Sequence, residues 1–183
     1  MGPTRSSVTV RPMRLDDLPR ILEIERRSFP TPWSKGAFVA ELTENRRARY
    51  LVAEVDGIVA GYIGMWLIAG EGHITNVAVH PDYRGRGIGR RLMEAMTDLC
   101  RREGGRRMTL EVRRSNRIAQ SLYESLGFVY CGTRRGYYRD NGEDAFIMWR
   151  ELDDDDNREW DTPGSVGTVV PGLGAVSGDR NEL

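Results

Sequence analysis

The sequence is poor in the residues that bind metals and form disulfides. Cysteine occurs twice, at Cys100 and Cys131, and histidine occurs twice, at His73 and His80. Their spacing matches no metal-binding motif, so we expect no structural metal. With so few cysteines, two free and partly buried thiols are favoured over a single disulfide.

The sequence also lacks a long apolar run. No stretch approaches the roughly 20 apolar residues that cross a bilayer, and the N-terminus has no apolar core of the kind found in signal peptides. Hydrophobic residues make up 39% of the chain and charged residues 30%, which is the balance of an ordinary globular domain. We therefore expect a cytoplasmic protein without membrane contact.

The net charge is zero but unevenly distributed. Residues 153–183 carry eight acidic residues and two arginines, which leaves 25 basic and 19 acidic residues before them. A folded body with this surplus of positive charge suits an anionic ligand such as a nucleotide.

The length of 183 residues fits one domain. We predict a disordered N-terminus at 1–7, a folded domain at 8–152 and a disordered tail at 153–183. In the tail, four consecutive aspartates precede a stretch rich in Gly, Ser and Pro. Such a composition buries too little apolar surface to offset the entropy of ordering.

The spacing of apolar residues predicts the order β-α-α-β-β-β-α-β-α-β-β over 8–152. Asp56–Gly57 is typical of a tight hairpin turn, Ser34 of a helix N-cap, and Gly127 of a helix end. This order predicts an α/β (α+β) fold, with a mixed sheet of about seven strands and helices on both faces.

One residue breaks the pattern of the first predicted helix, which Asp16 or Asp17 can cap. The apolar face of this helix runs from Leu18 to Phe29 at helical spacing, and Glu25 interrupts it. Glu23 and Glu25 can meet a basic peptide, but a solvated helix face is the simpler interpretation.

The most informative segment joins a strand to a helix. Glycines and arginines alternate there, in the order Arg84, Gly85, Arg86, Gly87, Ile88, Gly89 and Arg90. Glycines at such a junction let consecutive N–H groups turn toward one anion, and the helix start adds further donors. The spacing fits neither a dinucleotide-binding fingerprint nor a P-loop. It predicts a pyrophosphate site, with a glycine-rich turn and solvated arginines as the alternative.

This segment resembles the pyrophosphate-binding loop of the GNAT acetyltransferases. V-A-V-x-P-x-Y followed by R-G-x-G-I-G is the pattern of that family, and the predicted element order matches its fold. The resemblance implies acetyl-CoA as co-substrate and a bulged strand that parts from its neighbour to admit the pantetheine arm. It assigns the arm to the backbone of Val77, Ala78 and Val79, and the pyrophosphate to residues 84–90.

Two residues are candidates for the base and the acid that acetyl transfer to an amine requires. Glu111 lies on the polar face of the strand at 108–112, where a solvated carboxylate or an ion pair with Arg113 or Arg84 is the alternative. Tyr123 lies on an apolar helix face, where an ordinary core aromatic is the alternative. Its phenol is protonated at neutral pH, as a donor to a departing thiolate must be.

The resemblance bears on both candidates. L-E-V-R-x-S-N followed by A-x-x-L-Y-x-x-L-G-F is similar to the stretch in which related enzymes carry a base glutamate and an acid tyrosine. It implies that Glu111 is the base, that Tyr123 is the acid beside the cofactor, and that Asn116 bonds to the cofactor. The backbone N–H of Val79 is our candidate for an oxyanion donor.

Two further segments resemble family members that acetylate protein N-termini. They are P-W-S at Trp33, and Tyr137–Tyr138 followed by N-G-E-D-A. The resemblance implies a peptide groove at these aromatics, with simple packing as the alternative.

The same resemblance favours the N-terminal alanine of a small-subunit ribosomal protein as acceptor. A lysine or small amine is the second possibility, and a non-catalytic module binding acyl-CoA or RNA the third. We expect no dedicated nucleic-acid surface, and a monomer or weak dimer.

Overall fold

The protein was analysed as a computed structural model, which describes residues 7–152 and 181–182. The elements are β1 (Val8–Pro12), α1 (Leu18–Ser28), α2 (Lys35–Thr43), β2 (Ala48–Val55), β3 (Ile58–Ile68), β4 (Glu71–Val79), α3 (Ile88–Arg102), β5 (Arg107–Arg113), α4 (Arg117–Ser125), β6 (Val129–Tyr138), β7 (Glu143–Glu151) and β8 (Asn181–Glu182). Short 3-10 turns at Leu15–Asp17 and Pro81–Tyr83 precede α1 and α3. The predicted order is confirmed, with β8 as an addition.

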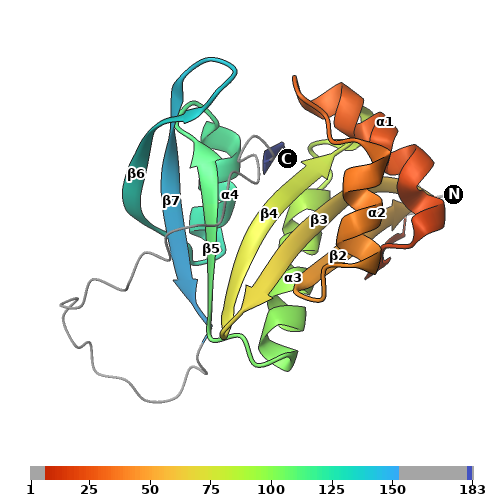
Figure 1. Ribbon diagram of the computed structural model, residues 1–183, viewed down its shortest axis with the longest axis horizontal. Coiled ribbons are helices and arrows are strands. Elements are labelled where there is room, and N and C mark those ends of the chain that lie inside the picture. The colour runs from red at the N-terminus through yellow and green to blue at the C-terminus, as the bar shows by residue number, and fades with distance from the viewer. Residues whose placement is uncertain (1–6, 153–180, 183) are drawn as a thin grey trace, which may run out of the picture.

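All the strands join one mixed sheet with helices on both faces, as predicted (Figure 1). The order across the sheet is β1-β2-β3-β4-β5-β7-β6, and β8 also pairs with β4. The pairs β4–β5 and β4–β8 are parallel, and the others are antiparallel. Helices α1 and α2 pack on one face with Tyr50 and Tyr62, while α3 and α4 pack on the other with Val77 and Leu110.

The ladder between β4 and β5 ends after three residue pairs. Its last pair joins His73 to Thr109. Beyond this point β4 pairs with β3 as far as Val79, and β5 pairs with β7 as far as Arg113. The two strands therefore part in the middle of the sheet, and Figure 1 shows them diverging.

A bulge in β4 lies just beyond the parting. Gly64 of β3 pairs with Asn76, whereas the next residue, Met65, pairs with Ile74, so Thr75 is the extra residue. A Cβ at Gly64 would lie 2.3 Å from the Asn76 side-chain oxygen, so the close approach at the bulge requires glycine. The bulge and the parting agree with the expected family fold.

The two predicted helix caps differ in outcome. The Ser34 hydroxyl accepts a hydrogen bond from the Ala37 N–H at 3.2 Å, as predicted for α2. Asp17 occupies the N-cap position of α1 but makes no capping bond with its side chain. Its carboxylate instead accepts from the Arg14 N–H at 2.7 Å and pairs with Arg11 at 2.8 Å.

Both cysteine thiols are free. Cys100 is buried and Cys131 is exposed, so the expectation of partial burial is wrong for both residues. No helix among the described residues is long and apolar enough to cross a membrane. Residues 1–6 and most of the predicted tail lie outside the described part of the chain, so their predicted disorder stays a prediction. The sequence pattern did not predict β8, which falls within that tail.

Candidate active site

Glu111 lies on β5 two residues beyond the point where the sheet parts. The alternate residues Met108, Leu110 and Val112 are fully buried against α3 and α4, which confirms the predicted face alternation. The Glu111 side chain points to the other face and keeps 23% of its surface exposed.

The surroundings of Glu111 change its acidity. Burial raises the pKa of its carboxyl, while the Arg134 guanidinium and then His73 act in the opposite direction. Arg134 of β6 lies 3.4 Å from the Glu111 carboxylate. Arg113 and Arg84 were the ion-pair partners expected from the sequence, and Arg134 was not among them. A carboxylate whose pKa is raised toward neutrality is a better proton acceptor.

Tyr123 comes from the opposite side of the sheet. It is fully buried in the α3–α4 core, with its ring centroid 6.0 Å from that of Phe128. Asn116 is the N-cap of helix α4, and its side-chain oxygen accepts from the Ala119 N–H at 3.1 Å. This cap fixes the start of α4 just after β5, and so fixes the position of Tyr123 relative to the parted strands.

Tyr138 lies within electrostatic range of both candidate catalytic residues. Burial raises the pKa of its phenol, and the Arg113 guanidinium 3.9 Å above its ring lowers it. Electrostatic interactions with Tyr137, Glu111 and Tyr123 act in the same direction as burial. One residue from each face of the sheet, Glu111 and Tyr123, therefore acts electrostatically on Tyr138.

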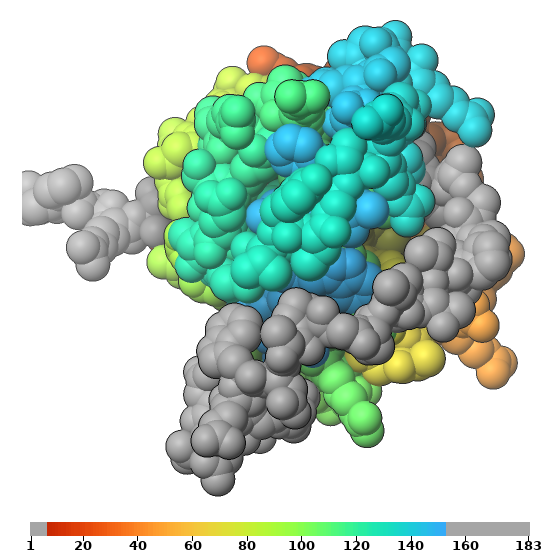
Figure 2. Space-filling view, turned by 90° about the vertical axis from the view of Figure 1, so that its left-hand side faces the viewer, coloured from red at the N-terminus to blue at the C-terminus, as the bar shows by residue number. Residues whose placement is uncertain are grey.

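Tyr138 and its neighbour occupy the end of β6. Tyr138 is buried, whereas Tyr137 is partly exposed, and their rings lie 5.3 Å apart. The turn that follows them projects from the top of the molecule in the space-filling view (Figure 2). A role for this pair in holding a peptide stays a prediction.

The glycines of the predicted phosphate loop have backbone conformations that favour glycine. Gly85 and Gly87 both have φ +74°, and no heavy atom lies within 4 Å of a Cβ added at either position. The left-handed conformation, rather than a lack of space, therefore requires glycine. Gly87 is the N-cap of α3, and buried Ile88 and Gly89 hold the helix start against the sheet. The loop is open at the helix N-terminus, where an anion is favoured.

The arginines of this loop do not converge on one point. Arg84 donates to the Val79 carbonyl at 3.0 Å and to the Ser28 hydroxyl at 3.3 Å, Arg86 to the Asp82 carbonyl at 3.2 Å, and Arg90 to the Ser125 hydroxyl at 2.7 Å. Arg84 thus ties the loop to the ends of β4 and α1, and Arg90 ties α3 to α4. In this arrangement the loop backbone is the better candidate for holding a pyrophosphate.

Glu25 does not lie on a solvated helix face, contrary to the simpler interpretation of the sequence. It is 0% exposed, because it belongs to the apolar face that α1 turns toward the sheet. Glu23, by contrast, keeps 40% of its side chain exposed. Trp33, in the loop after α1, is partly buried, with its ring centroid 5.3 Å from that of Phe38.

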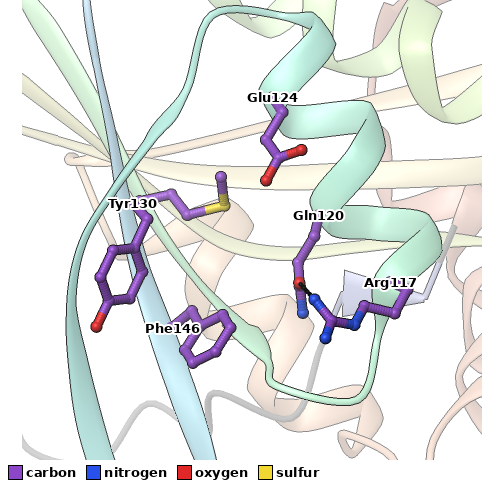
Figure 3. A pocket seen from close by; sticks show the side chains of 6 residues that line it. Arg117, Gln120, Glu124, Tyr130 and Phe146 are labelled. Carbon is purple, nitrogen blue, oxygen red and sulfur yellow. Dashed lines mark hydrogen bonds between the residues drawn. The ribbon is translucent and has the colours of Figure 1, made fainter.

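A pocket of about 220 Å³ opens elsewhere, between α4 and the strands β6 and β7 (Figure 3). It is lined by Arg117, Gln120, Glu124, Tyr130, Phe146 and Met148. None of these is a predicted site residue, so the pocket lies outside the candidate active site. Among the described residues, no three His, Cys, Asp or Glu side chains are grouped so as to hold a metal ion.

Comparison with known proteins points to one family. Residues 18–128 match the acetyltransferase (GNAT) family. A Bacillus subtilis protein named a putative [ribosomal protein bS18]-alanine N-acetyltransferase is 48% identical over 145 residues, which are 79% of this chain and 96% of that protein. The Escherichia coli K12 [ribosomal protein bS18]-alanine N-acetyltransferase is 38% identical over 144 residues, or 76% of this chain and 95% of that protein.

Solved structures agree with the sequence comparisons. The crystal structure of the ribosomal-protein-S18-alanine N-acetyltransferase from Escherichia coli has a TM-score of 0.74 and 33% identity, and covers 84% of this chain and 99% of its own. Ard1 from Thermoplasma volcanium has a TM-score of 0.73 and 28% identity, and covers 80% of this chain and 99% of its own.

Proposed function

The chain belongs to the acetyltransferase (GNAT) family, and from that premise we propose that it transfers the acetyl group of acetyl-CoA to a protein N-terminus. The proposed acceptor is the N-terminal alanine of a small-subunit ribosomal protein. The observation that carries this proposal is 48% identity, over 96% of its length, to a relative named for that reaction.

The geometry supports acetyl-CoA as the co-substrate. The backbone of Val77, Ala78 and Val79 lies along the edge of β4 that β5 leaves, where a pantetheine arm can pair with it. Gly85 and Gly87, whose backbone is in the left-handed conformation, form an open turn at the start of α3. Such a turn suits a pyrophosphate. Acetyl-CoA would supply the activated acetyl thioester at the parting of the sheet.

In the proposed reaction each candidate residue handles one proton or one developing charge. Glu111 accepts the proton that the attacking amine loses. Tyr123 donates its phenolic proton to the departing thiolate, and the Val79 N–H donates a hydrogen bond to the thioester oxygen as negative charge grows on it. The raised pKa of Glu111 suits a base that works near neutral pH.

An N-terminal amine also makes modest demands on that base. With a pKa near 7.7–8.0, against about 10.4 for lysine, its neutral fraction at pH 7 is a few hundred times larger. A single carboxylate is therefore sufficient for an N-terminus, whereas a lysine acceptor requires stronger assistance.

Acetyl-CoA turnover with three acceptors tests the proposal. They are a short peptide beginning with alanine, the same peptide with a blocked N-terminus and a free lysine, and a small polyamine. We expect acetylation of the free N-terminus alone. Activity confined to the lysine or the polyamine would refute the proposed acceptor, and no turnover with any of them would favour a non-catalytic module.

A further inference from the structure

Glu25 is a charged residue at a place where burial is costly. Its side chain is fully buried within the core that α1 and α2 form on the sheet. An ionised carboxylate in such a place costs several kcal/mol unless hydrogen bonds satisfy it. Leucine or isoleucine would continue the apolar face of α1, so the glutamate calls for an explanation other than packing.

The hydrogen bonds of Glu25 hold both ends of one loop. Its backbone carbonyl accepts from the Phe29 N–H at 2.9 Å, where α1 ends. Its carboxylate accepts from the Trp33 N–H at 2.7 Å, just before α2 begins. The loop 29–33 is thus closed on a single residue, and Pro30 and Pro32 further restrict its backbone.

The same carboxylate joins this loop to the sheet. Its other oxygen accepts a hydrogen bond from the Tyr62 hydroxyl of β3. The Tyr62 ring packs edge-on against Phe38 at 5.7 Å, and Phe38 in turn contacts Trp33 at 5.3 Å. Loop, helix and sheet are therefore coupled through one buried group.

We propose that Glu25 is a positioning residue for acceptor recognition. It sets the loop 29–33 so that Trp33 contacts the first residues of the substrate peptide. This inference rests on the proposed function, because the loop matters only if the acceptor is a peptide. Glu25 itself touches neither substrate, so its loss affects binding of the peptide rather than of acetyl-CoA.

Two variants and a matched control test this role. Glu25→Gln replaces one of the two oxygens, which accept from the Trp33 N–H and the Tyr62 hydroxyl, with an NH2 group that can only donate. Tyr62→Phe removes the hydroxyl that orients the carboxylate. Tyr50→Phe is the control, because Tyr50 also packs on Phe38, at 6.2 Å, and donates to a carboxylate, that of Glu41 in α2, at 3.1 Å. The control removes a similar hydrogen bond from the same core without touching the Trp33 N–H.

We expect Glu25→Gln to raise the KM for an alanine-initiated peptide about tenfold, which corresponds to about 1.4 kcal/mol. The KM for acetyl-CoA and the kcat at saturating peptide should stay within about twofold of wild type, since a uniform binding contribution affects KM alone. Tyr62→Phe should give a smaller shift in the same direction, and Tyr50→Phe none.

The outcomes separate this inference from the proposed function. If the wild type acetylates the peptide but both variants keep its KM, or Tyr50→Phe shifts it equally, the positioning role is wrong and the function stands. If a variant raises the KM for both substrates and also lowers kcat, Glu25 has a purely structural role. The positioning role is then wrong as well, and the proposed function stands. If the wild type acetylates no N-terminus, the proposed function fails and this inference fails with it.

A second observation concerns the parted edge of β4. Val77 and Ala78 pair with Ile63 and Tyr62 of β3 on one side, and with Asn181 and Glu182 of β8 on the other. Strand β8 therefore lies on the edge that β5 leaves, beside β4 in Figure 1. These are the backbone groups assigned above to the pantetheine arm.

We infer that the segment at 181–182 competes with acetyl-CoA for this edge. Replacing both of its residues with proline removes two backbone N–H donors and disfavours the pairing. Replacing both with alanine keeps those donors and is the control. Because a site blocked part of the time binds with a proportionally weaker apparent affinity, we expect the proline pair to lower the apparent Kd for acetyl-CoA about threefold or more.

Calorimetric titration of the full chain with acetyl-CoA measures this effect. Equal apparent Kd values for the wild type and the proline variant would refute competition, as would an equal change in the alanine variant. If the wild type acetylates peptides, and the wild type, the proline variant and the alanine variant all have the same Kd for acetyl-CoA, only competition is refuted. The proposed function then stands. A wild type that binds no acetyl-CoA refutes both.

Discussion

Replacing Glu111 with glutamine tests its proposed role as the base separately from its effect on stability. The substitution keeps the shape of the side chain and removes the proton acceptor. General bases contribute typically 10²–10⁴-fold, and the N-terminal amine is already partly neutral at pH 7, so we expect kcat to fall about 10²–10³-fold. The apparent Kd for acetyl-CoA should change little, because the proposed cofactor contacts come from β4 and the loop after it.

The same substitution should stabilise the fold at neutral pH. Burial raises the pKa of Glu111 above its ordinary value, so ionisation opposes folding at any pH above the raised pKa. Below the unfolded value, near 4.3, the carboxyl is protonated in both states and this penalty is absent. The melting temperature of Glu111→Gln should therefore exceed that of the wild type at pH 7.5 and match it near pH 4. Loss of the pair with half-exposed Arg134 reduces the gain only slightly.

Glu71→Gln is a matched control for both measurements. Glu71 lies on β4, keeps 24% of its side chain exposed and pairs with Arg107, compared with 23% exposure and the Arg134 pair for Glu111. Release of free CoA thiol gives kcat, and thermal melts at the two pH values give stability. A near-normal kcat for Glu111→Gln, or an equal loss for Glu71→Gln, would refute the assignment of the base.

Three further predictions test the site and the sheet. Tyr123→Phe should lower kcat while acetyl-CoA still binds in a calorimetric titration; an unchanged kcat would exclude it as the acid. Gly87→Ala forces a side chain into φ +74°, so it should cost about 1 kcal/mol in denaturant unfolding and raise the KM for acetyl-CoA. Gly64→Ala places a Cβ 2.3 Å from the Asn76 side-chain oxygen and should cost about 1–3 kcal/mol, whereas Gly132→Ala, with its nearest contact at 3.9 Å, should cost far less.

Local signals in the sequence were sufficient to predict most of the fold. Asp56–Gly57 adopts positive φ values of 51° and 82°, as a tight hairpin turn requires. The alternation along β5 correctly assigned Glu111 to the face opposite the α3–α4 core. These predictions held because each depends on neighbouring residues alone.

The missed features depend on residues far apart in the chain. Glu25 appeared to be a solvated exception because its partner Tyr62 lies 37 residues away. Arg134 of β6 reaches Glu111 of β5 across the intervening strand β7, and periodicity cannot reveal this strand order. The polar residue on the apolar face of α1 was the one available signal for the buried network.

The parting of the sheet explains how one proposed site can use residues from both faces of the sheet. Tyr123 belongs to the α3–α4 core, whereas Glu111 points to the opposite face of the sheet. In a continuous ladder the sheet backbone would separate them. Because the β4–β5 ladder ends at His73, the proposed base and the proposed acid can act on one thioester from opposite faces of the sheet. If the proposed roles are right, variants that restored pairing beyond His73 would abolish turnover without altering Glu111 or Tyr123.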